Sequence, residues 1–468
     1  MGKVRLFGFH IPSLFLMLAV AEACLISSSV VLAAFIRFDG NLVEVSHALG
    51  RLGYRAFPFG VIIMASLGAM GLYQVNFREG FSGQFLRVLA AFLIGWVTLA
   101  LLYYLVPSLY IGRGVAALAF AFSVVVIAVL RPLFFRLVDI DSLKPRVLIF
   151  GAGEKAAWIT RRMSHRADRR GFHLLGFVDA GGVRLVDGDA RILKLDVPLC
   201  EYICQQRVDQ IVVAVDDRRN GLPMQDLLQC RLAGVEVIEL ATFFERETST
   251  VALELVEPSW LVFGQGFRHG MLLGGVKRAL DMLLSVMLLV LLWPVLLLAA
   301  LAIKIEDGLQ APVLYSQTRV GSGRRLFKLY KLRSMRVDAE RTTGACWART
   351  DDNRITRVGK IVRKCRIDEL PQIYNVLRGD MSFVGPRPER PEFTQELEKR
   401  IRYYRERSTV KPGLTGWAQL RYPYGASDSD ATEKLKYDLF YIKNHNTFFD
   451  FLILLQTVEV VVFGKGAR

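Results

Sequence analysis

The sequence predicts a membrane protein of the α plus α/β class, and three observations support this prediction. Four apolar segments fill the N-terminal part, alternating short strands and helices follow, and another long apolar run opens a mainly α-helical C-terminal part. The 468 residues are long enough for such an organisation. The predicted parts are a bundle of four transmembrane helices (1–140), a Rossmann-like parallel-sheet domain (144–245), a linker (246–273) and a C-terminal domain (274–468).

The excess of basic residues indicates which classes of partner the protein binds. The chain carries 60 Lys and Arg against 44 Asp and Glu, yet 52% of its residues are hydrophobic. Cations beside long apolar runs favour anionic lipid head groups or phosphorylated substrates, and we expect no nucleic acid partner.

Each of the four N-terminal segments has close to the ~20 residues that a helix needs to cross hydrocarbon. They cover residues 11–35, 56–73, 85–106 and 115–138. The first lacks a small-residue cleavage site, so we expect a retained helix. Glu22 lies inside it, where a charge is expensive, and either a functional role or a role in helix packing or at the interface would account for it.

The end of the fourth span and the residues after it indicate the orientation. Arg131, Arg136, Lys144 and Arg146 follow one another closely there, and the rest of the chain is also basic. The positive-inside rule therefore predicts that the bulk of the chain is cytoplasmic, and four spans bring the N-terminus to the same side.

The central part begins with RVLIFGAGEKAAWI, which predicts a strand, a tight turn and a helix. HLLGFVDA, QIVVAVDD and GVEVIEL predict three more strands of a doubly wound parallel sheet. Gly151 and Gly153 match a dinucleotide-binding fingerprint, Ala156 replaces its third glycine, and Asp179 lies at a plausible distance for a ribose contact. A glycine turn that only connects strand to helix is the alternative.

A membrane-bound nucleotide-sugar dehydratase is a second functional alternative, since such enzymes join similar spans to such a domain. They use a Tyr-x-x-x-Lys pair, whereas here Tyr202 is followed by Gln206 at the lysine position. Redox chemistry is therefore not expected in the central domain.

The longest apolar run covers 276–308 and opens the C-terminal domain. Lys277, Arg278 and Lys304 flank it, and a crossing would put two basic domains on opposite sides of the membrane. Pro294 near its midpoint breaks helix hydrogen bonding. We therefore predict a re-entrant hairpin (276–305) bent near Trp293-Pro294, with a kinked spanning helix as the alternative.

Two adjacent acids, Asp368 and Glu369, lie among cations in RKCRIDELP. Pro371 is tolerated in a first helical turn, so we expect a helix to start at the acids with Asp368 as its N-cap. The positive field of that helix end would keep Asp368 ionised and attract phosphate, so that this carboxylate could attack phosphorus or hold a metal.

Fixed cations surround the acids and suit phosphate groups. Arg387 lies between two prolines in GPRP, which fixes its direction. The other candidate phosphate ligands are Arg363, Arg366, Lys328, Lys331 and Arg333. Phosphoryl transfer needs such cations, a nucleophile and a divalent metal, and Mg²⁺ held by Asp368 and Glu369 is the natural choice.

FKLYKLRSM, RIDELPQIYNVLRGDMSFVGPRPERPEF and KPGLTGWAQLRYPYG resemble the bacterial sugar transferase family of monotopic polyprenyl-phosphate phosphoglycosyl transferases. This resemblance covers 275–468. The spans and central domain further resemble the large undecaprenyl-phosphate glucose or galactose phosphotransferases. PSWLVFGQGFRHG and the C-terminal YDLFYIKNHNTFFDFLILLQTVEVVVFGKGAR resemble the subgroup associated with exosortase and PEP-CTERM exopolysaccharide loci.

The resemblance implies a two-step reaction at the cytoplasmic face of the bacterial inner membrane. Asp368 would attack the sugar-bearing phosphate of a UDP-sugar, release UMP and form a phosphosugar-aspartate, from which undecaprenyl phosphate takes the phosphosugar. Glu369 would act as metal partner or base, Arg363 and Arg387 would bind phosphates, and Asp438 would be a further polar contributor.

The same resemblance implies a homodimer and a role in starting exopolysaccharide or O-antigen assembly. Family members carry a small residue before the hairpin proline, where this chain has Trp293. A non-catalytic scaffold for polysaccharide assembly is the alternative function, and the intact RIDELP and GPRP motifs argue against it.

Overall fold

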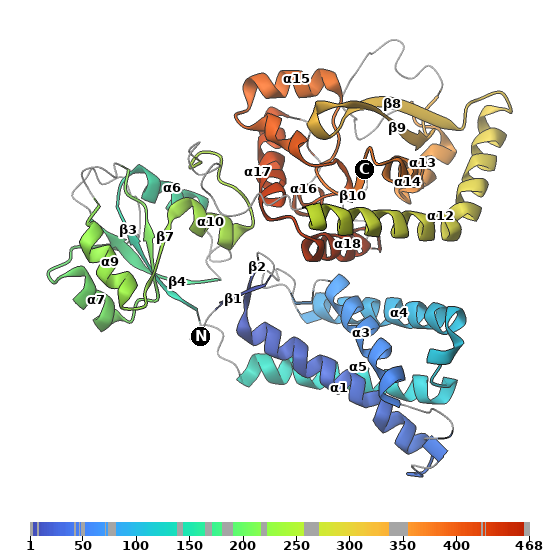
Figure 1. Cartoon of the computed structure of the whole chain (residues 1–468), viewed down its shortest axis with the longest axis horizontal. Coiled ribbons are helices and arrows are strands. Elements are labelled where there is room, and N and C mark those ends of the chain that lie inside the picture. The colour runs from blue at the N-terminus through green and yellow to red at the C-terminus, as the bar shows by residue number, and fades with distance from the viewer. Residues whose placement is uncertain are drawn as a thin grey trace. The chain divides into compact units, whose positions relative to one another are not determined.

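The computed structural model describes most of the chain as two compact units, Met1–Pro258 and Ser259–Arg468 (Figure 1). The division falls inside the predicted linker, and the PSWLVFGQGFRHG segment lies outside the described residues. The described residues are 3–6, 9–41, 44–45, 47, 52–70, 72–73, 81–137, 144–163, 171–179, 191–216, 222–256, 271–336, 354–422, 425 and 427–462.

Four helices match the four predicted N-terminal spans. α1 packs against α3 and α5, and α3 packs against α4. Three of them are long and apolar enough to cross a membrane by length and composition, and α3 is a shorter apolar helix. An antiparallel pair, β1 (Lys3–Leu6) with β2 (Phe9–Pro12), precedes them and was not predicted. The helices are α1 (Ser13–Arg37), α3 (Leu52–Ala69), α4 (Phe81–Leu105) and α5 (Arg113–Leu137), with a 3₁₀ turn at Pro107–Leu109.

Glu22 has a packing role in this bundle. Its side chain is 0% exposed and accepts hydrogen bonds from Arg131 of α5 at 2.7 and 3.0 Å and from the hydroxyl of Tyr73. Arg131 also donates to the carbonyl of Leu72 at 3.2 Å. One carboxylate and one guanidinium therefore join α1, α5 and the segment that follows α3.

The central domain is the predicted parallel sheet, in the order β5-β4-β3-β6-β7. The core on one face includes residues of α6 and α10, and the core on the other includes residues of α7 and α9. The sequence did not predict β5, which has only two residues. The strands are β3 (Arg146–Phe150), β4 (His173–Val178), β5 (Ile192–Leu193), β6 (Gln210–Val213) and β7 (Glu236–Glu239). The helices are α6 (Glu154–Arg162), α7 (Leu199–Gln206), α9 (Met224–Leu232) and α10 (Leu240–Thr248).

The central domain extends beyond its predicted boundary at residue 245. That position falls inside α10, and Ala252 and Leu255 after the helix pack on the same core. The apolar residues of VALELV therefore belong to the domain rather than to a linker.

The C-terminal unit is mainly α-helical, as predicted, and carries an antiparallel hairpin, β8 with β9, and a short parallel pair, β10 with β11. Its first elements are α12 (Met271–Asp307), β8 (Leu314–Val320), β9 (Leu326–Leu332), α13 (Arg357–Lys364), a 3₁₀ turn at Ile367–Glu369 and α14 (Gln372–Arg378). The others are β10 (Ser382–Val384), α15 (Pro391–Arg400), a 3₁₀ segment at Tyr404–Thr409, β11 (Gly413–Thr415), α16 (Trp417–Arg421), α17 (Asp428–Asn444) and α18 (Thr447–Val462).

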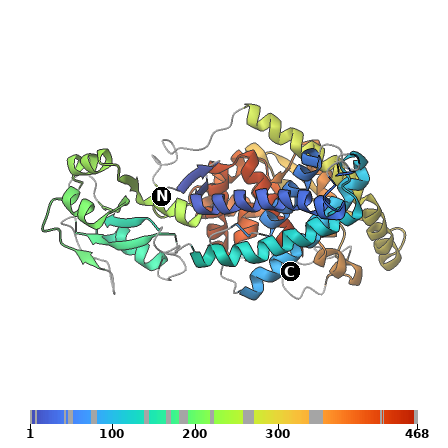
Figure 2. The same ribbon diagram turned by 90° about the horizontal axis from the view of Figure 1, so that it is seen from below.

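α12 stays helical through Pro294, so the predicted break is a bend, which Figures 1 and 2 show. A straight helix of 37 residues would separate its ends by about 55 Å. Here both ends contact the same domain: Lys277 donates to the carbonyl of Val384 at 3.1 Å, and Glu306 accepts from the first two amides of α13 at 2.8 Å. The middle exposes large apolar side chains, such as Val290 at 69%.

We expect Glu22→Leu to lower the unfolding free energy of the bundle by about 3 kcal/mol or more, because it leaves Arg131 buried without its counter-ion. The double variant Glu22→Leu/Arg131→Leu should recover most of the loss, since an apolar pair leaves no charge unpaired. Thermal unfolding of the detergent-purified protein measures both. Equal losses in the two variants would contradict the packing role.

Candidate active site

Asn375 joins the segment that carries the acids to the β8–β9 hairpin. This α14 side chain is fully buried, and its amide nitrogen donates to the carbonyl of Lys328 at 2.7 Å. Its amide oxygen accepts from the backbone N–H of Tyr330 at 3.2 Å. A single side chain thus satisfies a donor and an acceptor of β9 and holds α14 beside that strand.

The acids do not start a regular helix, and the predicted N-cap role of Asp368 is wrong. Arg366 has a left-handed backbone with φ +56°, which turns the chain out of α13. Asp368 then lies inside a 3₁₀ turn, and α14 begins only at Gln372, with Pro371 in the N-cap position. Pro371 itself has helical backbone angles, φ −61° and ψ −17°, and the regular helix follows it directly.

Glu369 is the centre of a cluster of cations. Its Oε1 lies 3.0 Å from Lys331 Nζ and 2.9 Å from Arg387 Nη2, and its Oε2 lies 3.7 Å from Arg366 Nη1. Asp368 has a single ion-pair contact in the described part of the chain, its Oδ2 to Lys331 Nζ at 3.8 Å. Four of the predicted site residues therefore lie around Glu369.

The two carboxyl groups have different electrostatic surroundings. Burial raises the pKa of Asp368 above its usual value, although Lys331 opposes this. Burial would also raise the pKa of Glu369, but the charges of Lys331 and Arg387 outweigh it and hold that pKa well below its usual range. Glu369 is thus a permanent anion engaged by cations, and Asp368 is the carboxylate with less of its charge neutralised.

The cluster fits a magnesium ion that arrives with a phosphate ligand. Magnesium commonly uses one or two carboxylates together with substrate phosphates. Within the described ranges, no group of three Asp, Glu, His or Cys side chains forms a metal site. Asp368 and Glu369 alone, with Lys331 and Arg387 beside them, favour a metal ion only when phosphate oxygens complete its shell.

The remaining predicted cations divide into two sets. Arg363 lies near enough to lower the pKa of Asp368, and Lys328 lies exposed on β9. Arg333 does not join the cluster: it is buried and pairs with Asp307 at the end of α12 at 2.8 Å. Through its Nη2, Arg333 therefore helps to attach α12, because a buried guanidinium needs a carboxylate beside it. Its role as a phosphate ligand stays a prediction.

Three glycines let the GPRP loop pack against the chain around β11. A Cβ on Gly385 would lie 2.3 Å from the carbonyl oxygen of Lys411, and one on Gly413 would lie 2.1 Å from the nitrogen of Gly385. A Cβ on Gly416 would lie 2.3 Å from the carbonyl oxygen of Gly385. The glycines of KPGLTGW are thus needed where this segment meets the loop that carries Arg387.

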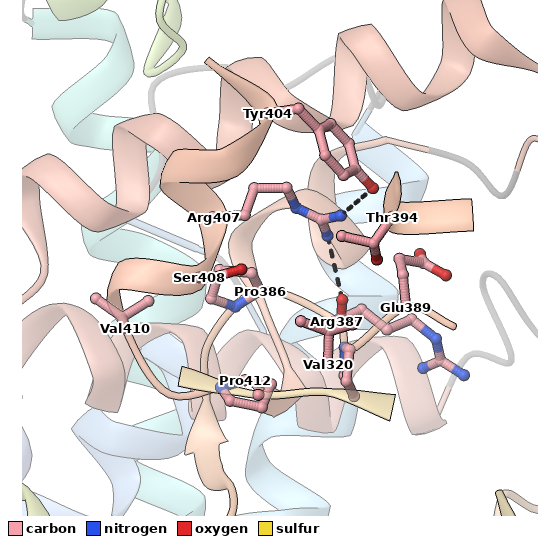
Figure 3. A pocket seen from close by; sticks show the side chains of 12 residues that line it. Val320, Pro386, Arg387, Glu389, Thr394, Tyr404, Arg407, Ser408, Val410 and Pro412 are labelled. Atoms are coloured by element: carbon pink, nitrogen blue, oxygen red, sulfur yellow. Dashed lines mark hydrogen bonds between the residues drawn. The ribbon is translucent and has the colours of Figure 1, made fainter. Parts of the chain in front are cut away.

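Asp438 binds Arg407, a residue that sequence reasoning missed. The Arg407 Nε donates to Asp438 at 2.8 Å. Figure 3 shows that its Nη2 donates to the carbonyl of Arg387, at 3.1 Å. Its Nη1 donates to the Tyr404 hydroxyl at 2.5 Å. In the sequence Arg407 belongs to the charged stretch RIRYYRER, which resembles a solvated surface helix.

In the central domain, Asp216 caps the N-terminus of α6, the helix that follows the glycine turn. Asp216, after β6, accepts the backbone N–H of Glu154 at 2.7 Å and that of Lys155 at 2.8 Å. A Cβ on Gly153 would lie 2.0 Å from the same carboxylate. A dinucleotide phosphate would need these amides, so the geometry favours the interpretation of the glycines as a structural turn.

Comparison with known proteins adds an independent result. Residues 273–464 match the family described as bacterial sugar transferase. The UDP-N-acetylgalactosamine-undecaprenyl-phosphate N-acetylgalactosaminephosphotransferase of Aeromonas hydrophila is 39% identical over 56% of this chain and 61% of its own length. The undecaprenyl-phosphate glucose phosphotransferase of Komagataeibacter xylinus is 34% identical over 69% of this chain and 60% of its own length.

A shorter relative is covered almost completely. The exopolysaccharide production protein PSS of Rhizobium leguminosarum bv. phaseoli is 39% identical over 41% of this chain and 98% of its own length. By contrast, the chain spans about 60% of the length of the Aeromonas and Komagataeibacter relatives. The predicted exosortase-associated subgroup is not tested by these matches and stays a prediction.

We expect Asp216→Ala to speed hydrogen exchange at the amides of Glu154 and Lys155 by roughly 5- to 30-fold, the loss expected for a helix cap of about 1–2 kcal/mol. Asp216→Asn should lose less, since an amide oxygen still accepts one bond. Exchange followed by mass spectrometry measures this. Unchanged exchange in Asp216→Ala, or saturable binding of NAD⁺ to the wild-type protein in the same experiment, would contradict the cap.

Proposed function

The chain belongs to the bacterial sugar transferase family, and we propose that it transfers a sugar 1-phosphate from a UDP-sugar to undecaprenyl phosphate and releases UMP. One observation carries the proposal: a buried, weakly paired Asp368 lies beside a cluster of cations held together by Glu369. Both substrates are phosphates, which such cations bind. The relatives' names give two different sugars, so the identity of the sugar needs a direct measurement.

In the proposed first step, an oxygen of Asp368 attacks the phosphorus that carries the sugar. A P–O bond to that oxygen forms, and the bond between this phosphorus and the oxygen of the UMP phosphate breaks, so UMP leaves with the electron pair. Lys331 and Arg387 neutralise charge on the phosphate oxygens during this step. Glu369 holds the two cations in place, and this positioning role fits its lowered pKa better than a role as base.

In the proposed second step, an oxygen of undecaprenyl phosphate attacks the same phosphorus. The bond to Asp368 breaks, the carboxylate is restored, and a polyprenyl-diphosphate sugar leaves. Magnesium, held by Asp368 or Glu369 together with phosphate oxygens, would supply further charge neutralisation. The product would start exopolysaccharide or O-antigen assembly, in line with the name of the Rhizobium relative.

We further propose that α12 is re-entrant, dips into the cytoplasmic leaflet of the inner membrane and returns. The contacts of Lys277 and Glu306 with one domain support this, because a spanning helix would separate them. The exposed apolar middle of α12 gives the hydrocarbon a surface to cover. The active site would then lie at the level of the lipid head groups, where a lipid phosphate meets a soluble nucleotide sugar.

We expect purified protein with magnesium and the correct UDP-sugar, but without lipid phosphate, to release at most one UMP per chain and gain the mass of one phosphosugar. Asp368→Asn should form no adduct, because an amide is a poor nucleophile. Intact-mass spectrometry of wild type and variant, run against a panel of UDP-sugars, measures both and identifies the sugar.

Three outcomes of this assay have different meanings. UMP release only with added undecaprenyl phosphate, and no adduct, would keep the transferase and exclude Asp368 as nucleophile. Full activity with EDTA present would exclude the metal. No turnover with any sugar under any condition would favour the non-catalytic scaffold.

The re-entrant α12 predicts that both its ends are reached from one side of the membrane. Val276→Cys and Leu309→Cys, each made in a cysteine-free background, should react with a membrane-impermeant maleimide in inverted vesicles and not in spheroplasts. Leu291→Cys in the exposed middle should react in neither preparation, because lipid covers it. Labelling of the two ends from opposite sides would show a spanning helix.

A further inference from the structure

We propose that Arg407 is a positioning residue for the transfer reaction, which acts by fixing the backbone of Arg387. This inference rests on the proposed function and deepens it, because it explains how one phosphate-binding side chain is directed at Glu369. The guanidinium of Arg407 binds the backbone carbonyl of Arg387 (Figure 3).

Arg407 makes three polar contacts to three different parts of the domain. Its side chain is 12% exposed and reaches Asp438 of α17, the hydroxyl of Tyr404 and the carbonyl of Arg387. Asp438 is 3% exposed and supplies the buried counter-ion. A planar guanidinium with five donors can make these contacts together, whereas a lysine ammonium offers a single point of charge.

The carbonyl of Arg387 is the part of the GPRP loop that needs an anchor. Pro386 and Pro388 fix their own φ angles, and Pro388 restricts Arg387 to the extended region. Within that region the peptide plane after Arg387 can still rotate. The loop is also held on both sides of Arg387, because the carbonyl of Pro386 accepts from Gly413 and the carbonyl of Pro388 accepts from Arg319, so this rotation shifts the Cα atom from which the Arg387 side chain starts. The hydrogen bond from Arg407 removes this freedom, and the guanidinium of Arg387 then reaches Glu369 at 2.9 Å.

A second arginine supports the same loop from β8. Arg319 Nη1 donates to the carbonyl of Pro388 at 3.1 Å and lies 3.6 Å from Glu389. Two consecutive carbonyls, those of Arg387 and Pro388, therefore each bind a guanidinium. A small cavity of about 30 Å³, lined by residues of the loop and of the 3₁₀ segment that carries Arg407, is the free space beside these contacts.

A stabilising role alone would not require an arginine at this position. Removing one partner of a buried ion pair destabilises a protein, but replacing both by apolar residues is often neutral. An apolar pair in place of Arg407 and Asp438 can restore packing, but it cannot hold the Arg387 carbonyl. The double variant therefore distinguishes a positioning role of Arg407 from a purely stabilising one.

The test compares Arg407→Lys and the double variant Arg407→Leu/Asp438→Leu with wild type, by the rate of UMP release with UDP-sugar and undecaprenyl phosphate. We expect Arg407→Lys to lower kcat/KM by roughly 100-fold, as for a catalytic group displaced by about 1 Å. The double variant should unfold near the wild-type temperature but stay as slow as Arg407→Lys. Recovery of activity together with stability would overturn the proposal.

A double-mutant cycle tests whether Arg407 affects the reaction through Arg387. If Arg407 acts through Arg387, then Arg407→Lys should cause less than a threefold change in an Arg387→Ala background. Additive losses would overturn the proposal. Where Arg387→Ala leaves too little activity to measure, the stability comparison above still decides it.

Arg400→Leu is the matched control. Arg400 also pairs with an aspartate of α17, Asp428, at 2.9 Å. In this pair, however, both side chains are exposed to solvent. We expect unchanged activity and stability. If the wild-type protein forms the adduct and the Arg407 variants keep full activity, this inference alone is rejected. If the wild-type protein forms no adduct that depends on Asp368, the proposed mechanism is rejected.

Discussion

The site depends on one carboxylate that is shared by cations from separate segments. Glu369 binds Lys331 of β9 and Arg387 of the GPRP loop, and neither cation would stay beside the other without an anion between them. Each segment is in turn held by a backbone contact: Asn375 fixes β9, and Arg407 fixes the carbonyl of Arg387. Asp368 lies next to this assembly with less of its own charge compensated, which suits the proposed role of nucleophile.

α12 takes part in the same domain at both of its ends. Near its start, Lys277 binds the Val384 carbonyl beside the GPRP loop and pairs with Asp450 at 2.5 Å. At its end, Glu306 caps α13, which carries Arg363, and Asp307 binds Arg333. The helix that exposes many large apolar side chains is therefore attached next to the GPRP loop and to α13, which carry the proposed phosphate ligands Arg387 and Arg363.

Features with a local signal in the sequence could be predicted, and features made by distant contacts could not. Apolar length predicted the four N-terminal helices, and alternating strands and helices predicted the central sheet, because both follow from burial of neighbouring residues. The position of Asp368 in a 3₁₀ turn depends on the left-handed Arg366, and the role of Arg333 depends on Asp307, which precedes it by 26 residues. Arg407 and Asp216 also act on partners far along the chain, so their neighbours in the sequence give no sign of their roles.

The close packing of Gly385 against Gly413 and Gly416 has a consequence for protein synthesis. Both acids leave the ribosome before residues 413–416, and Asp438 leaves later still, so a nascent chain that already contains Asp368 has no fixed Arg387. Such a chain already carries its apolar helices, but the candidate site is incomplete. The order in which the segments are translated thus delays completion of the candidate site until the domain is nearly finished.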